Sequence, residues 1–81
     1  MSKDEVYHIV QEIIMEILPD VEKENIAIEK QLKDIGANSI DRMEIVTMSM
    51  RELNIKIPLM SFARVNNIEG LVDVLHENVN N

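Results

Sequence analysis

Near the start of the chain, the apolar positions recur at steps of three and four residues, which is the spacing of one face of an amphipathic helix. They are Val6, Ile9, Val10, Ile13, Ile14, Ile17 and Leu18. Ser2, followed three residues later by Glu5, has the signature of a capping box at a helix start. Pro19 disfavours helical backbone in the residue before it. The pattern therefore predicts a first helix that begins close to Ser2 and stops at Pro19.

Residues 19–38 form a long connection in which four apolar residues interrupt the charged ones, namely Ile26, Ile28, Leu32 and Ile35. A structureless loop of this length is uncommon in a compact domain unless it is functional or held in place. We therefore expect these four residues to pin the loop to the core. The connection ends in Gly36, Ala37, Asn38 and Ser39, which are small or polar residues suited to a turn followed by a helix N-cap.

The second half of the chain predicts three more helices. The first runs from Ser39 or Ile40 to Leu53, and its expected inward face consists of Ile40, Met43, Val46, Met50 and Leu53. Residues 54–58 read as an extended connector because Pro58 interrupts any helix. A short third helix is expected around 59–64. The last helix, capped by Asn66 or Asn67, has an expected buried stripe of Ile68, Leu71, Val72, Leu75 and Val79.

These elements predict an all-α fold, a small four-helix bundle with a long first loop and a short third helix. With 81 residues, we expect one domain spanning 1–81 and working as a monomer. Phe62 and Tyr7 are the only aromatic residues besides the histidines, so the core must consist of Ile, Leu, Val and Met. A domain this small leaves little room for an enclosed active-site cleft.

A formal net charge of -7 repels nucleic-acid phosphates and anionic membranes and favours partners rich in Lys or Arg. We expect neither a nucleic-acid nor a membrane partner. The charged start of the chain shows no signal peptide and no transmembrane run, which favours a cytoplasmic location. The chain has no Cys, so any thiol chemistry must be imported on a prosthetic group.

Catalytic and metal-binding patterns are not evident. His8 and His76 lie on different predicted helices and belong to no ligand set, and Gly36 and Gly70 are too few for a phosphate cradle. Asp41 and Glu44 lie three apart on one helix. A solvated helix face explains this pair better than a catalytic role, although the same face suits docking of basic partners.

The segment 36–41 is the one place where small residues, a hydroxyl and a helix start coincide. The simplest interpretation is structural, because a serine or asparagine before a helix is usually its N-cap. Ser39 or Asn38 is then only a cap, and the chain is an acidic helical interaction module. The alternative interpretation is a modification site at Ser39.

The sequence Gly36-Ala37-Asn38-Ser39-Ile40-Asp41, followed by Glu44-Ile45-Val46 and Ile55-Lys56-Ile57-Pro58, resembles the acyl carrier proteins. In that family a Gly-x-Asp-Ser-Leu-Asp block precedes an Ile-Pro pair, and the likeness extends over the whole chain. The resemblance implies an acyl-carrier-protein type of bundle. It also implies that a phosphopantetheinyl transferase moves 4'-phosphopantetheine from coenzyme A onto the hydroxyl of Ser39. Enzymatic activity of the chain itself is not expected.

Physical chemistry favours a phosphodiester at this position, because a helix N-terminus offers unpaired amides and the positive end of the macrodipole. We expect the small Gly36 and Ala37 to keep the approach to Ser39 clear. The methionines Met43, Met48 and Met50 either help to shelter a short acyl chain or simply fill the core.

The resemblance also implies a partner surface next to Ser39, formed by Asn38, Ile40, Asp41, Arg42 and Glu44. Glu52 belongs to the same acidic helix. Charges at the rim of an interface mainly steer the encounter of partners, which suits a shuttle that must release them. We expect Asp41 and Glu44 to contact basic surfaces, and Arg42 to help in choosing among partners.

Some residues depart from the family pattern. Asn38 stands where most of the family has Asp, Arg42 adds a positive charge after Asp41, and Thr47 and Ser49 thin the apolar pattern. With these departures the chain resembles the discrete carriers of bacterial polyketide pathways. In particular, residues 38–45 resemble the donor carriers that install β-branches together with a hydroxymethylglutaryl-synthase-like enzyme.

That resemblance implies a malonyl cargo that is decarboxylated to acetyl. The implied partners are an acyltransferase, a ketosynthase-like decarboxylase and the hydroxymethylglutaryl-synthase-like enzyme. A carrier of fatty-acid synthesis and a carrier of amino or other acids are the alternatives within the family.

Overall fold

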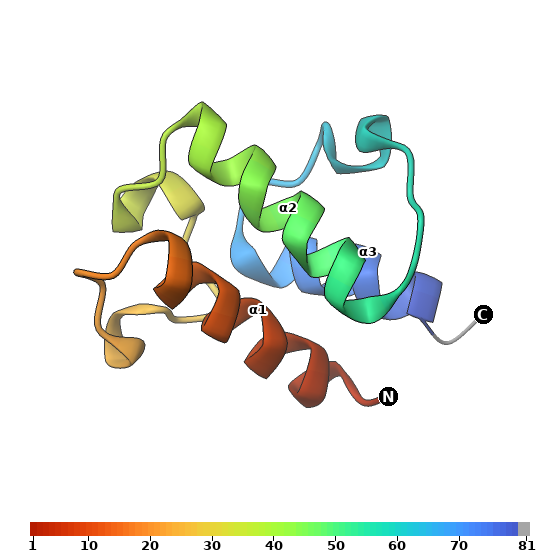
Figure 1. Ribbon diagram of the computed structural model, residues 1–81, viewed down its shortest axis with the longest axis horizontal. Helices are drawn as coiled ribbons and strands as arrows, with labels where there is room; N and C mark the ends of the chain where they lie inside the picture. Colours follow the sequence, from red (N-terminus) through yellow and green to blue (C-terminus); the bar gives the residue numbers. More distant parts are fainter. Residues whose placement is uncertain (80–81) are drawn as a thin grey trace.

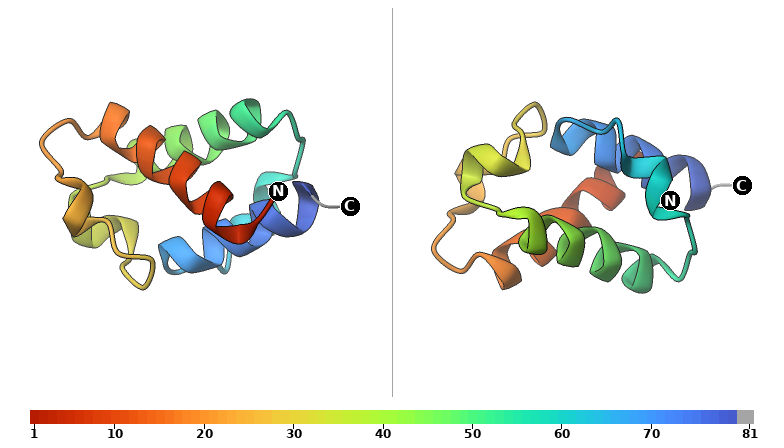
Figure 2. Two further views of the ribbon diagram at one scale, coloured as in Figure 1. Left: turned by 90° about the horizontal axis from the view of Figure 1, so that it is seen from below. Right: turned by 90° about the horizontal axis from the view of Figure 1, so that it is seen from above.

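The computed structural model describes residues 1–79, which form three α-helices and no strand. The α-helices are α1 (Lys3–Ile17), α2 (Ser39–Leu53) and α3 (Ile68–Val79). Three 3-10 helices lie in the connections: η1 (Lys23–Asn25), η2 (Leu32–Ile35) and η3 (Leu59–Phe62). Helix α1 runs opposite to α2 and α3 and packs against both (Figures 1 and 2). The predicted all-α class is confirmed, and no helix of the described chain is long and apolar enough to cross a membrane.

Helix α1 begins as the sequence predicts. The Ser2 hydroxyl accepts a hydrogen bond from the amide of Glu5 at 3.1 Å, and the Glu5 carboxylate accepts one from the amide of Ser2 at 2.9 Å. The bonds to the Ser2 amide and hydroxyl hold the pKa of Glu5 below its ordinary value, because both favour the charged carboxylate. Lys3 joins this end of α1 to α3 through ion pairs with Glu69 and Asp73 at 2.9 and 3.0 Å.

The long first loop is pinned to α1 at Ile26, whose side chain is only 1% exposed. The Tyr7 hydroxyl donates a hydrogen bond to the Ile26 carbonyl, and the buried Gln11 amide donates to the same carbonyl at 3.3 Å. Leu32 and Ile35 are half-buried against the core. The expected pinning is therefore confirmed for these three loop residues.

The same loop completes the start of α3. The amide of Ile68 donates to the Lys30 carbonyl at 2.8 Å, and the amide of Glu69 donates to the Ile28 carbonyl at 2.7 Å. The Asn67 side chain accepts from the amide of Gly70 at 2.8 Å, so Asn67 caps the helix. Ile28, although only half-buried, thus anchors the loop through its backbone.

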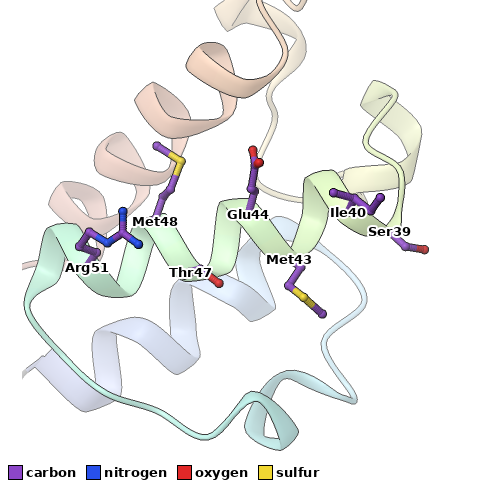
Figure 3. A pocket seen from close by; sticks show the side chains of 7 residues that line it. All are labelled: Ser39, Ile40, Met43, Glu44, Thr47, Met48 and Arg51. Atoms are coloured by element: carbon purple, nitrogen blue, oxygen red, sulfur yellow. The ribbon is translucent and has the colours of Figure 1, made fainter.

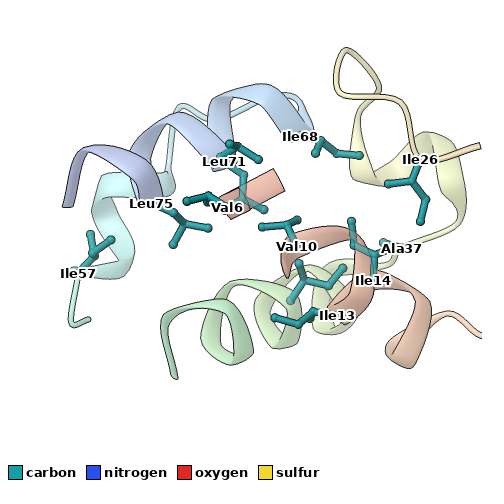
Figure 4. Close-up of a cluster of buried hydrophobic side chains, with 12 residues drawn as sticks. Val6, Val10, Ile13, Ile14, Ile26, Ala37, Ile57, Ile68, Leu71 and Leu75 are labelled. Carbon is teal, nitrogen blue, oxygen red and sulfur yellow. The ribbon is translucent and has the colours of Figure 1, made fainter. Parts of the chain in front are cut away.

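The core lies between the three helices and includes two residues of the first loop and one of the connector after α2 (Figure 4). Its members are Val6, Val10, Ile13, Ile14, Ile26, Ala37, Ile45, Ile57, Ile68, Leu71, Val72 and Leu75. Four of the five residues predicted to form the stripe of α3 are fully buried, and Val79 is half-buried. Aliphatic side chains therefore build the core, as the composition requires.

The predicted inward face of α2 is partly wrong. Ile40 and Met43 are 74% and 59% exposed, whereas Val46, Met50 and Leu53 pack against the core. The buried face of α2 is instead centred on Ile45 and Ser49, which are fully buried. Ile40 and Met43 precede Ile45 by five and two positions, which places them across a helix of about 3.6 residues per turn.

The hydrogen bond of Ser49 shows how a polar residue can lie on the buried face of α2. Its hydroxyl donates to the Ile45 carbonyl at 2.6 Å, so the polar group is satisfied within the helix and carries no unpaired donor into the core. A polar residue in the middle of α2 can therefore occupy the buried face.

The short third helix of the predicted bundle is a single 3-10 turn, η3. Pro58 precedes it, and two of its four residues, Leu59 and Met60, are exposed large apolar side chains. A turn this short, with little apolar surface to bury, lacks the packing that normally sustains an α-helix. The described chain thus has three α-helices where four helices were predicted.

Replacing Ile26 with alanine should lower the free energy of unfolding by about 2–5 kcal/mol, because it empties a buried site that ties the loop to α1. Urea unfolding of the protein measures the loss. The matched control is Ile28→Ala in the same loop, where the half-buried side chain should cost clearly less. Equal losses at both positions would contradict the pinning role of Ile26.

Candidate functional site

Ser39 is the first residue of α2, and its side chain is exposed to solvent. The N-cap is its neighbour Asn38, whose side-chain oxygen accepts from the amide of Asp41 at 2.8 Å. The Asp41 carboxylate in turn accepts from the amide of Asn38 at 3.1 Å. Because Asn38 and Asp41 form the complete capping box, the Ser39 hydroxyl takes no part in it. The capping interpretation therefore applies to Asn38 and leaves Ser39 available.

The capping box also determines which amides remain at this end of α2. The first four amides of a helix have no intrahelical acceptor, and here the amides of Asn38 and Asp41 are used by the box. The first helical bond comes from the amide of Arg42 to the Asn38 carbonyl at 2.9 Å. Within the described chain, the amides of Ser39 and Ile40 keep no protein acceptor. Two donors and the positive helix end thus lie beside the Ser39 hydroxyl, and this arrangement fits a phosphate group.

Arg42 lies one turn after Ser39 on the same face of α2. Its Nη2 atom donates to Ser39 Oγ at 3.2 Å. The guanidinium therefore contacts the oxygen atom that the sequence predicts as the modification site. It also adds positive charge to the helix end.

The turn before Ser39 differs from the prediction that Gly36 and Ala37 keep the approach to Ser39 clear. Gly36 ends η2 with φ of 94°, a left-handed backbone conformation that glycine adopts without strain. Ala37 is only 5% exposed and belongs to the core, so its small size does not clear the approach to Ser39. It instead anchors the end of the loop to the bundle, directly before the capping box.

An open groove of about 550 Å³ runs along the outer face of α2 from Ser39 (Figure 3). It is lined by Ser39, Ile40, Met43, Glu44, Thr47, Met48 and Arg51. The exposed side chains of Ile40 and Met43 therefore give this face an apolar centre, with Glu44 and Arg51 as its charges.

A second groove, of about 310 Å³, lies between α2, η3 and α3 and also begins at Ser39. It is lined by Leu32, Ser39, Arg42, Met43, Val46, Leu59, Phe62, Ala63, Val65 and Leu71. Met43 lines both grooves, and Met48 lines the outer one. Met48 and Met50 both pack against the core, so core filling applies to these two methionines and not to the exposed Met43.

The residues predicted to contact partners lie in different parts of the structure. Ile40 and Glu44 share the outer groove with Ser39, and Arg42 faces the second groove. The Asp41 carboxylate is engaged in the capping box. Glu52 lies apart, in a groove beside α1 that is lined by Ile9, Glu12, Ile13, Glu16 and Glu52.

Leu59 lines the second groove and was not anticipated from the sequence as part of the site. The sequence offers only a weak signal for it, a leucine directly after Pro58 in a short segment; its exposure is seen only in the structure. The histidines line neither groove: His8 is exposed and His76 is half-buried. His8 on α1 lies 3.3 Å from the Gln11 side chain.

Residues 8–75 match the family described as "Phosphopantetheine attachment site". The polyketide biosynthesis acyl-carrier-protein AcpK of Bacillus subtilis (strain 168) is 37% identical over 79 residues, 98% of this chain and 96% of that protein. The acyl carrier protein of Guillardia theta is 31% identical over 80 residues, which is 98% of either chain.

One solved structure is the crystal structure of the Curacin biosynthetic pathway HMG synthase in complex with acetyl donor-ACP. The matching chain has a TM-score of 0.88 and 33% sequence identity, with 96% of this chain and 100% of that chain covered. The protein therefore belongs to the acyl carrier protein family with a phosphopantetheine attachment domain. Members of this family are carriers that partner enzymes use as substrates, and their prosthetic group is 4'-phosphopantetheine.

Replacing Asn38 with alanine should lower the free energy of unfolding by about 1 kcal/mol, because the amide of Asp41 loses its acceptor. Asn38→Asp should keep most of the stability, since a carboxylate caps equally well. Asn66→Ala, at an exposed asparagine that caps no helix, is the matched control and should change little. If urea unfolding showed the same stability for Asn38→Ala and Asn66→Ala, Asn38 would not be the effective cap.

Proposed function

We propose that this protein carries acyl groups as thioesters on a phosphopantetheine arm attached to Ser39. The single observation that carries the proposal is the exposed Ser39 hydroxyl at the first residue of α2, outside the capping box. Two amides without protein acceptors and the Arg42 guanidinium surround that oxygen in the described structure. Ser39 also lies inside the matched segment 8–75.

Attachment requires the Ser39 oxygen to form a bond to the phosphorus that carries pantetheine in coenzyme A. The phosphoanhydride bond to the nucleotide breaks, 3'-phosphoadenosine 5'-phosphate leaves, and the hydroxyl proton passes to a base of the transferase. The amides of Ser39 and Ile40 would hold the negative phosphodiester at the positive end of α2. When bound, the arm supplies the thiol that a chain without cysteine lacks.

We further propose that the carrier is a discrete donor for β-branching in bacterial polyketide biosynthesis, working as a cytoplasmic monomer. Two likenesses support this, one to a polyketide carrier of Bacillus subtilis and one to an acetyl donor-ACP in complex with an HMG synthase. Asn38 and Arg42, which depart from the common family pattern, agree with it. The alternative of a fatty-acid carrier has the support of the acyl carrier protein from Cyanidium caldarium, 29% identical over 82 residues, 100% of this chain and 94% of that protein.

In the donor role, an acyltransferase places malonyl on the arm. A ketosynthase-like decarboxylase then releases carbon dioxide, and a proton takes its place to leave an acetyl thioester. The acetyl group passes to a hydroxymethylglutaryl-synthase-like enzyme, and the thiol of the arm is restored. The second groove, which begins at Ser39 and is lined mainly by apolar residues, is large enough to shelter so short an acyl group.

The partner surface of this proposal is the outer groove of α2 together with the residues around its start. Asn38, Asp41 and Arg42 lie at that start, and Ile40 and Glu44 follow in the groove. Exposed apolar side chains between charges are typical of interface centres with a polar rim. Of the two acidic residues, Glu44 is the better probe, because Asp41 also holds the capping box together.

Incubating the apo protein with coenzyme A, magnesium and a broad-specificity phosphopantetheinyl transferase should add one phosphopantetheine to its intact mass. Ser39→Ala should gain nothing, because it removes the attacking oxygen. Ser61→Ala, at an exposed serine on η3, is the matched control and should be loaded like the wild type. A wild-type protein that gained no mass with several transferases would instead be an unmodified acidic interaction module.

An acetyl-loaded wild type should transfer its acetyl group to a hydroxymethylglutaryl-synthase-like enzyme much faster than to an elongating ketosynthase of fatty-acid synthesis. Glu44→Lys should slow the favoured transfer several-fold at low salt and less at high salt, because steering by exposed charges is screened. Transfer is followed by the mass of the carrier over time. Glu77→Lys, at an exposed position near the end of α3, is the control and should behave like the wild type. Equal or reversed rates for the two enzymes would favour the fatty-acid carrier.

A further inference from the structure

The contact between Arg42 and Ser39 is the one side-chain interaction that the Ser39 oxygen makes in the described chain. Residues three apart are neighbours on a helix surface, so the two side chains meet without any help from tertiary structure. We propose that Arg42 binds the phosphate of the phosphopantetheine arm and directs the arm toward the second groove. This inference rests on attachment of the arm at Ser39.

The chemistry of the two groups matches. A phosphodiester on Ser39 carries one negative charge, and its unesterified oxygens are bonded to the phosphorus, two bonds from Oγ. The Arg42 nitrogen lies 3.2 Å from Oγ, so a small rotation of either side chain brings the guanidinium onto those oxygens. Guanidinium and phosphate form charge-assisted, often bidentate, hydrogen bonds that a compact ammonium does not reproduce. Together with the amides of Ser39 and Ile40, Arg42 would hold the phosphate on two sides.

Arg42 is available for this role. No described carboxylate forms an ion pair with it, and the neighbouring Asp41 carboxylate is turned back to the amide of Asn38. Position 38 matters as well, because the N-cap lies at the same helix end as the phosphate site. An aspartate there would add a negative charge beside the phosphate, whereas Asn38 caps the helix without charge.

The position of Arg42 also determines the direction of the arm. Arg42 lines the second groove with Ser39 but does not line the outer groove. A phosphate held by Arg42 therefore places the root of the arm at the mouth of the second groove, away from Ile40 and Glu44. The outer face of α2 remains free for a partner while the arm is held.

Nuclear magnetic resonance of the protein before and after loading tests the proposal, with loading verified by intact mass. In the wild type at low salt, the side-chain Nε–H signal of Arg42 should shift on loading, while that of Arg51 should not. Arg51 is the internal control, because it is an exposed arginine of α2 that lines only the outer groove. The phosphorus resonance of the loaded protein should move in Arg42→Gln and remain in place in Arg51→Gln.

Two more variants sharpen the test. Arg42→Lys should restore only part of the wild-type phosphorus shift, because an ammonium lacks the planar pair of donors. Asn38→Asp should reduce the shift of the Arg42 signal on loading, since a capping carboxylate places a negative charge beside the phosphate and weakens its binding.

The outcomes separate this inference from the function on which it rests. A loaded protein whose Arg42 signal does not move, and whose phosphorus resonance is the same in Arg42→Gln, overturns the role of Arg42 alone. A protein that gains no phosphopantetheine overturns the attachment at Ser39 and this inference with it.

Discussion

The hydrogen bonds between Asn38 and Asp41 determine where α2 begins, and the properties of Ser39 depend on that boundary. Each of the two residues satisfies the backbone amide of the other, so the helix is capped without any contribution from the residue between them that carries the hydroxyl. Had Ser39 been the cap, its oxygen would be engaged with the backbone and poorly placed for an incoming group. The capping residue and the residue proposed for attachment are thus adjacent but distinct.

Local patterns allowed much of the fold to be predicted. The capping box at Ser2, the stop at Pro19 and the apolar stripe of α3 are set by residues a few positions apart, and all appear as expected. The inward face of α2 depends on tertiary packing, and there the pattern misled, because Ile40 and Met43 are exposed while Ser49 is buried. A hydroxyl that bonds to its own helix behaves as a small core residue, and hydrophobic periodicity does not show this.

The site shows the same division between local and tertiary information. A hydroxyl, small residues and a helix start coincide within one short segment, but Ser39 was predicted as a modification site only because that segment resembles the acyl carrier proteins. The contact from Arg42 to Ser39 and the two grooves could not be predicted from the sequence, because side-chain direction and the position of η3 are not local properties. Ala37 was misplaced for a similar reason, because the turn at Gly36 directs it into the core.

The length of the first loop has a consequence for how this fold can vary. Consider a shorter connection between the end of α1 and the start of α2 that lacked residues 28–30. Such a connection would remove the carbonyls of Ile28 and Lys30, which are the acceptors for the first two amides of α3. The amide of the fully buried Ile68 would then be stranded without water or protein to receive it. The loop is therefore as long as the distant N-terminus of α3 requires, and a deletion within it would damage the last helix rather than the helices it connects.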